Sequence, residues 1–436
     1  MENQVRISVI MPSLNVNEYI DACMASVRNQ TLCDIEILCI DAGSTDGTVE
    51  KLAEYAQKDA RIKLLHSDIR SYGHQVNMGL GSAVGEYIAI VETDDYVSTN
   101  MLERLYDVAK RGTIDYVKGN FASYVDYYGH RRFYPDILIE DVDVNYEKVF
   151  CPRDRVRLPV RDYSIWRGIY RTEFLRENRI YCSETPGASY QDIGFVLQVY
   201  DKAKQCAYVE DIVYYYQCDR EGASSCKNEV LCFVQEEFRR LFGQKLIEQN
   251  KAIYMRLVNC LLPELNKLLP KLQFKLDEEF VLKPYRWIGD QIRQAMDCGV
   301  IDEDDFDAEM WGNLQLALED IEKYAECQSE KYHEMMLEKQ ERLAPFCGKT
   351  LIIFGSGVYG RRHLIELEEL GAHIYCVCDN SLTKVGTILE GYEVISPEQA
   401  HKEYPEAVFV IPDRPYKTEM MNQLKAIGAE YVVMTV

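Results

Sequence analysis

Residues 85–95 have the sequence Gly-Glu-Tyr-Ile-Ala-Ile-Val-Glu-Thr-Asp-Asp, an apolar run that ends in the acidic cluster Glu92-Thr93-Asp94-Asp95. The apolar part is typical of a buried strand in a parallel sheet. Three carboxylates so close together repel one another, and core packing gives no reason for their position. A hard divalent cation does, because Mg²⁺ and Mn²⁺ prefer oxygen ligands. The alternative is an acidic helix start that the helix dipole stabilises.

Three more apolar runs precede this segment in the sequence, and polar residues follow them. Val5–Met11 precedes Pro12, Ile35–Ile40 precedes Asp41, and Ile62–Leu65 is the third run. Helix-period patterns separate the runs, which predicts βαβ units and a mostly parallel sheet. In such sheets, ligands bind beyond the carboxyl ends of the strands. We therefore expect the polar residues after the runs to line one rim.

Turn and cap signals accompany these runs. Asn15-x-x-Glu18 resembles a capping box at the start of the first helix. Asp41 and Asp46 lie close to glycines, so turn and cap chemistry is one alternative for both, and contact with a ligand is the other. We expect Asp46 to act mainly as a cap and Asp41 mainly as a ligand contact.

The order of these segments resembles that of the family 2 glycosyltransferases of the GT-A fold. The resemblance covers about half of the chain and rests on Ile7–Asn15, Ile40–Thr48, Asn77-x-Gly79 and residues 85–95. It implies an α/β domain of the GT-A type, which is a Rossmann-like nucleotide-sugar-binding fold. It also implies a glycosyltransferase that is inverting and metal-dependent and acts in polysaccharide or glycoconjugate synthesis.

The resemblance assigns roles to residues of the expected rim. Pro12, Ser13 and Asn15 belong to a loop that would hold the base and ribose of the donor. Asp41 begins a second loop with the same role. Asp94 and Asp95 match the family's metal and diphosphate motif. We expect Asp95 to be the direct ligand of a divalent metal, Mn²⁺ or Mg²⁺, and Asp94 to contact both the metal and the donor.

Two positions depart from the family pattern. Ala42 stands where the family often has a second aspartate that contacts the base, and Glu92 stands where it often has Asp. Alanine cannot form that hydrogen bond, so the identity of the base stays open. The donor that we expect is a UDP-sugar, and the acceptor is a saccharide or glycoconjugate.

A glycosyl transfer also needs a base for the acceptor hydroxyl. Ser189–Phe195 resembles the family's Glu-Asp segment, with Gln191 in place of Glu, and we expect Asp192 to be the base. A helix cap is the alternative for Asp192, and the two roles are compatible. Trp166 is a candidate for stacking on a sugar or for a place in the core.

Composition excludes several classes of function. The net charge of −22 over 436 residues argues against nucleic-acid binding and a polybasic membrane anchor, although residues 153–171 hold six arginines. Fifteen cysteines without a C-x-x-C pair favour buried, reduced thiols. Residues 1–10 lack a signal-peptide pattern, and no apolar run approaches the ~20 residues of a transmembrane segment. We expect a cytoplasmic protein and leave open a peripheral position at the inner membrane face.

Changes in composition predict three parts: a GT-A domain at 1–220, a helical region at 221–346 and a small Rossmann-like α/β domain at 347–436. Phe233–Leu246 and Leu314–Leu343 have the pattern of amphipathic helices. The second of these is a candidate spacer or dimerisation helix, so a homo-oligomer is one alternative.

The third part carries Gly355-x-Gly357-x-x-Gly360 after an apolar run, and Asp379 follows at the spacing of a dinucleotide fingerprint. Only about 90 residues remain, which is too few for two mononucleotide-binding halves. Binding of a nucleotide sugar, packing against a partner, and no ligand at all stay as alternatives, and NAD is disfavoured.

Three rival functions compete with glycosyl transfer. Ala42 and Gln191 favour a non-catalytic nucleotide-sugar-binding or scaffolding protein with a degenerate transferase domain. An NAD-linked oxidoreductase would need a substrate-domain acid or base, and none is evident. A nucleotidyltransferase would carry a glycine-rich loop with a basic residue after the first strand, and Met11–Val16 has neither.

Overall fold

The computed structural model describes residues 5–127, 130–138, 142, 144–218, 228–243, 250–344, 348–413 and 416–434. Within these residues the chain forms two compact units. The first consists of Met1–Ser123, Pro135–Tyr216 and Ser224–Ser329, and the second of Tyr124–Tyr134, Gln217–Ala223 and Glu330–Val436. The expected domain boundaries, 220/221 and 346/347, lie outside the described residues.

The described residues of the N-terminal half build one mixed sheet of nine strands. The strands are β1 (Ile7–Ser13), β2 (Ile35–Asp41), β3 (Ile62–His66), β4 (Tyr87–Ile90), β5 (Tyr96–Val97), β6 (Tyr116–Tyr127), β7 (His130–Asp136), β8 (Gly168–Arg171) and β9 (Cys206–Gln217). The sheet order is β3-β2-β1-β4-β8-β6-β9-β5, with β7 paired to β6. β3, β2, β1 and β4 are parallel, as the sequence predicts, and β8 continues the sheet in the antiparallel direction.

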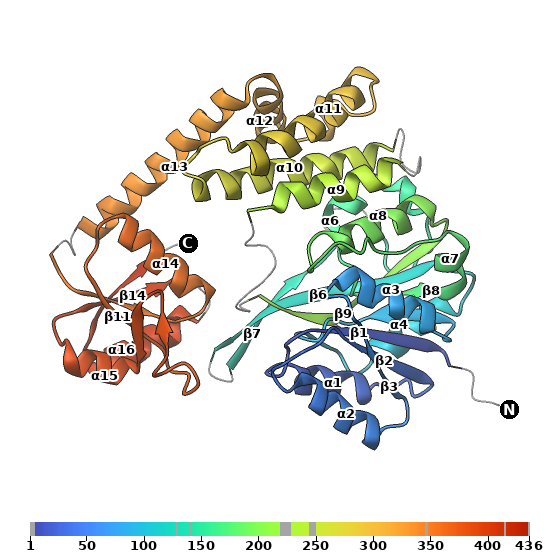
Figure 1. Cartoon of the computed structure of the whole chain (residues 1–436), viewed down its shortest axis with the longest axis horizontal. Helices are drawn as coiled ribbons and strands as arrows, with labels where there is room; N and C mark the ends of the chain where they lie inside the picture. Colours follow the sequence, from blue (N-terminus) through green and yellow to red (C-terminus); the bar gives the residue numbers. More distant parts are fainter. Residues whose placement is uncertain are drawn as a thin grey trace. The chain divides into compact units, whose positions relative to one another are not determined.

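Helices accompany both the parallel and the antiparallel strands of this sheet. They are α1 (Ile20–Arg28), α2 (Thr48–Lys58), α3 (Tyr72–Ser82), α4 (Met101–Ala109), η1 (Pro152–Asp154), α6 (Leu158–Arg161), α7 (Thr172–Glu177) and α8 (Gln191–Lys202). Figure 1 shows α1 and α2 on one side of β1 and β2, and α3 on the other. The helix α3 packs directly on β1, because a Cβ at Gly79 would lie 2.5 Å from Cγ2 of Ile10.

The expected capping box at the first helix is wrong. The helix α1 begins at Ile20, and Tyr19 before it makes no side-chain cap bond. The side chain of Asn15 accepts the N–H of Thr45 at 2.9 Å instead, so it joins two loops. Asp46, expected mainly as a cap, lies one residue before the N-cap Gly47 of α2, and its carboxylate accepts the N–H and the hydroxyl of Thr48.

A helical layer follows the sheet, and it belongs to the first unit up to Ser329, within its last helix. Its elements are α9 (Val230–Gly243), α10 (Lys251–Lys271), the π-helix η3 (Glu278–Leu282), α11 (Lys283–Asp297), η4 (Glu303–Asp305), α12 (Ala308–Glu319) and α13 (Ile321–Leu343). The single helix expected over Leu314–Leu343 is wrong, because the backbone of Asp320 is extended and its carboxylate accepts the N–H of Lys323 at 2.9 Å. The cap that starts α13 therefore ends α12. One hydrophobic cluster joins this layer to Ile193 and Leu197 of α8.

A second sheet forms the C-terminal part. Its elements are β10 (Leu351–Phe354), α14 (Val358–Glu369), β11 (Ile374–Cys378), β12 (Ile388–Leu389), β13 (Tyr392–Ile395), α15 (Pro397–Glu403), β14 (Val408–Pro412), α16 (Lys417–Ile427) and β15 (Glu430–Met434). The order is β12-β13-β11-β10-β14-β15, and β12 is antiparallel. Ile352 and Phe354 pack with α15 and α16, whereas Leu351 and Ile353 pack with α14, so both faces are buried.

The glycine-rich loop of this part is hydrogen-bonded to Asp379, the acidic residue of the fingerprint. Gly355 has a φ of 113°, and a Cβ at Gly360 would lie 1.6 Å from the carbonyl oxygen of Gly355. Asp379 is buried and accepts the N–H of Ser356 at 2.8 Å and its hydroxyl at 2.6 Å. The carboxylate of the fingerprint therefore stabilises the loop itself.

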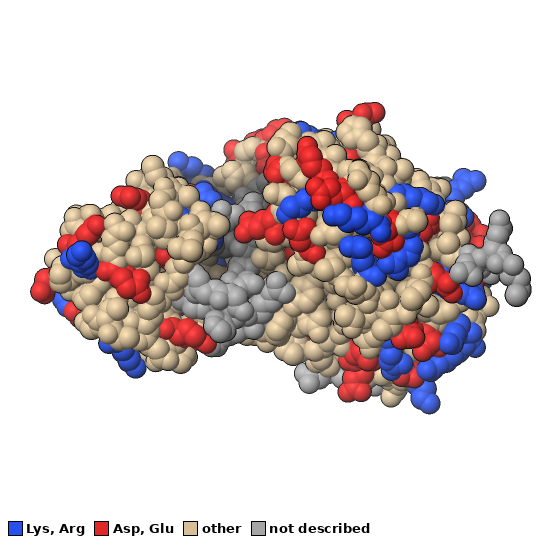
Figure 2. All heavy atoms as spheres, turned by 90° about the horizontal axis from the view of Figure 1, so that it is seen from below, with Lys and Arg blue, Asp and Glu red and all other residues tan. Residues whose placement is uncertain are grey.

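Surface charge and thiols agree with the composition. Figure 2 shows acidic and basic side chains interspersed over one face of the molecule. Thirteen of the fifteen cysteines lie in the described residues; seven of these are buried, and Cys33 and Cys298 are exposed. Within the described ranges, no helix is long and apolar enough to cross a bilayer.

Candidate active site

The loops that follow β1, β2 and β4 are joined at one rim of the sheet. Ser13 lies opposite Asp41 in the parallel register of β1 and β2. The hydroxyl of Thr93 donates to the carbonyl oxygen of Pro12 at 2.8 Å, and the N–H of Asn15 donates to Oγ of Ser44 at 2.9 Å. The structure therefore brings together the three segments that the sequence singled out.

Asp41 shapes the second of these loops. Its carboxylate is buried and accepts the N–H groups of Gly43 and Ser44 at 2.8 and 2.9 Å, and the Ser44 hydroxyl at 2.5 Å. Gly43 has a φ of 81°, so the tight turn depends on glycine. Turn chemistry thus accounts for the position of Asp41, and its contact with a donor stays a prediction.

The other expected donor residues differ in exposure. Pro12 and Ser13 are buried at the end of β1, whereas Asn15 is exposed and has a φ of 52°. Ala42 is also buried, and its N–H donates to the carbonyl oxygen of Ser13 at 3.1 Å. Its methyl group offers a base no hydrogen bond.

The acidic cluster lies directly after β4. One carboxylate oxygen each from Glu92, Asp94 and Asp95 lie within 4.8 Å of one another. Asp95 is 2% exposed, and its Oδ2 accepts the hydroxyl of Tyr214 at 2.8 Å. Such oxygen-rich sites suit a hard divalent cation, and a hydrogen bond to a carboxylate fixes its orientation. The three residues therefore fit a divalent metal.

Two tyrosines that sequence reasoning missed organise this cluster. Tyr214 comes from β9 and accepts the N–H of Glu92 at 3.1 Å while it donates to Asp95. Tyr72, the first residue of α3, donates to Oε1 of Glu92 at 3.1 Å. Burial, followed by the neighbouring carboxylates, raises the pKa of both hydroxyls well above the usual value, so both stay protonated donors.

Tyr72 also connects the cluster to Asp192. The charges of Glu92 and Asp192 both contribute to its raised pKa, which places Tyr72 within electrostatic reach of the two carboxylates. Its backbone N–H donates to the carbonyl oxygen of Gly187 at 2.9 Å. The loop before α8 is therefore attached to the start of α3.

Asp192 lies in the first turn of α8 and is half-buried. Burial raises the pKa of its carboxyl, whereas backbone N–H groups and Arg256 oppose that rise. Gln191 is buried; it accepts the N–H of Ser189 at 2.5 Å and donates to the Thr185 hydroxyl at 2.9 Å. The glutamine therefore has a structural role in the loop before α8.

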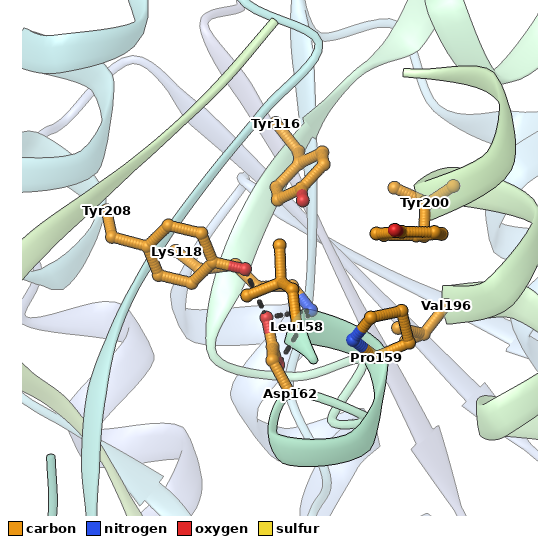
Figure 3. Close-up of a pocket in the computed structure, with 9 residues that line it drawn as sticks. Tyr116, Lys118, Leu158, Pro159, Asp162, Val196, Tyr200 and Tyr208 are labelled. Carbon is orange, nitrogen blue, oxygen red and sulfur yellow. Dashed lines mark hydrogen bonds and ion pairs between the residues drawn. The ribbon is translucent and has the colours of Figure 1, made fainter. Parts of the chain in front are cut away.

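A buried ionic cluster supports the segment that carries Trp166. Asp162 accepts hydrogen bonds from Lys118 and from Tyr208 (Figure 3). Arg167 lies 2.9 Å from its Oδ1. Burial alone would raise the pKa of Asp162, but Arg167 and Lys118 bring it down to about 2. Burial lowers the pKa of Lys118 to about 8.

Trp166 belongs to the core. It stacks on Tyr214 with ring centroids 4.2 Å apart and on Tyr216 at 5.6 Å, and it meets Phe121 edge-on at 5.0 Å. Only 8% of its surface is exposed. Of the two alternatives from the sequence, the structure favours packing over a sugar platform.

Comparison with known proteins gives a family match in the N-terminal part. Residues 8–168 match the family described as Glycosyl transferase family 2. The matched range contains the three loops and the acidic cluster and ends before Asp192.

Curated relatives share only part of their length with this chain. The uncharacterized glycosyltransferase EpsJ of Bacillus subtilis (strain 168) is 30% identical over 212 residues, which cover 48% of this chain and 60% of EpsJ. Glycosyltransferase GlyG of Streptococcus pneumoniae serotype 4 is 36% identical over 142 residues, which cover 32% of this chain and 47% of GlyG. The chain thus spans about half the length of these relatives.

A solved structure shares the fold. Residues 1–349 of S. aureus TarS, in complex with UDP-GlcNAc, superpose with a TM-score of 0.55 at 20% identity, over 76% of this chain and 92% of that chain. At this identity the likeness shows the fold alone, and it supports the GT-A architecture of the first unit.

Proposed function

We propose, because residues 8–168 match the family described as Glycosyl transferase family 2, that the protein transfers a sugar from a nucleotide-diphosphate sugar to a hydroxyl of a saccharide or glycoconjugate. One observation carries this proposal: the carboxylates of Glu92, Asp94 and Asp95 lie within 4.8 Å of one another beside the loops after β1 and β2. A UDP-sugar is the donor that we expect, with Asn15 and Asp41 in the loops that hold it.

Asp95 and Asp94, with Glu92, would hold a divalent cation, whose charge would offset that of the departing diphosphate. Tyr214 keeps the Asp95 carboxylate oriented through its hydroxyl. Tyr72 does the same for Glu92. These two hydrogen bonds are the contribution of β9 and α3 to the proposed metal site.

Asp192 is the proposed base. A raised pKa brings the carboxylate closer to the proton affinity that a general base needs near neutral pH. Its carboxylate takes the proton of the acceptor hydroxyl while the oxygen attacks the anomeric carbon and the bond to the diphosphate breaks. A single displacement of this kind inverts the configuration at that carbon.

One experiment tests the transfer and the base together. UDP-glucose, UDP-galactose and UDP-GlcNAc are mixed with the protein and Mn²⁺, and thermal stabilisation and release of UDP are measured. We expect one donor to stabilise the wild type and to be turned over. Asp192→Asn should keep the stabilisation and lose about 10²-fold or more in turnover.

The control is Asp68→Asn, because the Asp68 side chain is 95% exposed. Unchanged turnover in Asp192→Asn would remove that residue from the base role. Donor-induced stabilisation without any turnover in the wild type would favour the non-catalytic alternative, and no stabilisation by any donor would contradict the proposed function.

A further inference from the structure

A groove with a volume of about 490 Å³ lies outside the region matched by the family. Its size falls within the range of small-molecule sites. One wall is the segment Tyr181–Pro186, and the other is α9, which contributes Glu236 and Arg240. None of these residues was singled out by the sequence.

The first wall is fixed to α3. Asn77 donates to the carbonyl oxygen of Cys182 at 2.9 Å and accepts the N–H of the same residue at 3.0 Å. Asn77 also donates to Oε1 of Glu184 at 2.9 Å, and Nδ1 of His74 lies 2.8 Å from Oε2. The groove wall therefore has a defined shape before any ligand binds.

The second wall is fixed to α8. A Cβ at Gly194 would lie 1.6 Å from Oε1 of Glu237, so the Glu237 side chain of α9 lies directly against α8 and would have to shift for a larger residue there. Glu237 accepts the hydroxyl of Ser183 and pairs with Arg240. This buried carboxylate thus joins the two walls through Ser183 and Arg240.

The groove adjoins α8, the helix that carries the proposed base. Gln198 of α8 donates to the carbonyl oxygen of Tyr181 in the groove wall at 2.9 Å. Glu237, which accepts the Ser183 hydroxyl, lies against Gly194, two residues after Asp192. A ligand in this groove would therefore lie close to the helix whose first turn holds the carboxylate that must reach an acceptor hydroxyl.

The chemistry of the lining selects among ligands. Tyr181 exposes 44% of its surface, and Glu184 and Glu236 are exposed carboxylates. Among the described residues that line the groove, Arg240 is the only cation, and it is already paired with Glu237. Glu184 contacts His74 and Asn77, and Glu236 adds a second exposed carboxylate, so the lining disfavours phosphate or uronate groups. An aromatic ring beside hydrogen-bond acceptors suits a sugar, which offers an apolar face and hydroxyl donors.

We propose that this groove binds a neutral saccharide, the acceptor of the transfer proposed above, with Tyr181 against a sugar ring and Glu184 and Glu236 accepting hydrogen bonds from its hydroxyls. This assignment rests on the proposed function. It gives the helical region a direct part in acceptor binding through α9.

Binding of p-nitrophenyl β-glucoside, β-galactoside, N-acetyl-β-glucosaminide and β-glucuronide, measured without donor, tests the proposal. We expect at least one neutral glycoside to bind more tightly than the glucuronide. Tyr181→Ala should weaken that binding about tenfold, Tyr181→Phe should change it little, and Glu236→Gln should weaken it several-fold. Tyr163→Ala removes a tyrosine of similar exposure, 47%, outside the lining and serves as the matched control.

The same variants are then compared in transfer to the glycoside that binds. A tenfold rise of acceptor KM in Tyr181→Ala, absent in Tyr163→Ala, would support the groove. Equal binding by wild type and Tyr181→Ala, tighter binding of the glucuronide, or no binding of any glycoside would overturn it. Glycoside binding and donor stabilisation are measured separately. Glycoside binding without donor stabilisation would contradict the proposed function alone, and donor stabilisation without glycoside binding would contradict the groove alone.

Discussion

Asp162 is the counter-ion of a buried ionic cluster, and several side chains depend on it. Its carboxylate is buried with two cations, Lys118 and Arg167, and it also accepts the hydroxyl of Tyr208 at 2.5 Å. Removing the negative charge would leave two buried cations without a counter-ion, which costs far more than loss of a surface pair. The segment that positions Trp166 and β8 depends on this one residue.

We therefore expect Asp162→Asn to lower the free energy of unfolding by about 3–5 kcal/mol in urea denaturation. Asp68→Asn, at an exposed side chain, should stay within about 0.5 kcal/mol. The pKa of Asp162 is about 2 in the folded protein against 3.8 ordinarily, so the stabilisation is present above pH 4 and lost as pH falls towards 2. A difference between wild type and variant that persisted unchanged at pH 2 would contradict this account.

The pKa of Asp192 is shifted upwards, opposite to that of Asp162, and this predicts how activity depends on pH. Burial raises the pKa of Asp192 above 3.8, and only the deprotonated form accepts a proton. Activity should therefore fall on the acid side with a midpoint above 3.8, as measured by kcat/KM against pH with the donor that binds. A plateau that extends below pH 4 would argue against Asp192 as the base.

Single residues were predictable only where they follow a strand. Asp94 and Asp95 come directly after an apolar run, so their place at the rim followed from the sequence. Tyr72 and Tyr214 reach the cluster from α3 and β9, and Tyr214 lies inside an apolar strand pattern. Their role depends on contacts between distant segments, which local patterns do not contain.

Among the elements, α3 contacts both the strand ends at the rim of the sheet and the segment Tyr181–Pro186 of the groove wall. Gln75 donates to the carbonyl oxygens of Ser13 and Ile40 at 2.9 and 2.6 Å, and Asn77 holds Cys182 on the other side. Glycines disfavour a helix in the local sequence. Gly73 and Gly79 nevertheless lie where α3 approaches its neighbours closely.

Two glycines of α3 make a matched pair. A Cβ at Gly79 would lie 2.5–2.8 Å from Ile10, whereas a Cβ at Gly81 would meet nothing within 4 Å. We expect Gly79→Ala to lower the free energy of unfolding by about 1–3 kcal/mol. Gly81→Ala should raise it by about 0.5–1 kcal/mol, because alanine favours the helix. Both variants are measured by thermal and by urea denaturation. If Gly79→Ala and Gly81→Ala changed the free energy of unfolding equally, α3 would pack on β1 more loosely than described.

For the whole molecule, two sets of hydrophobic clusters belong to different compact units. The nine-stranded sheet and the helical layer have their clusters in the first unit, and the six-stranded sheet has its own in the second. The three-part division from the sequence stays a prediction. Composition distinguishes helical from βα texture, but it does not show that the helical layer shares a cluster with α8.

Calorimetry should therefore resolve more than one transition. Gly360→Ala places a Cβ 1.6 Å from a backbone oxygen of the C-terminal loop, whereas Gly357→Ala meets nothing within 4 Å. We expect Gly360→Ala to lower one transition by about 4 °C or more and to leave the other in place, with Gly357→Ala as control. If all transitions moved together, the two units would unfold as one cooperative body.

The rate at which the buried cysteines are alkylated measures how often the surrounding structure opens. Cys182 lies in the groove wall and Cys376 and Cys378 lie in the C-terminal sheet, and burial raises the pKa of each thiol. Because a thiol alkylates through its thiolate, these positions stay protected from iodoacetamide until their surroundings open. Peptide mass spectrometry after timed alkylation would then report the opening of the groove and of the C-terminal sheet separately, in the unmodified protein, while Cys33 and Cys298 react from the start.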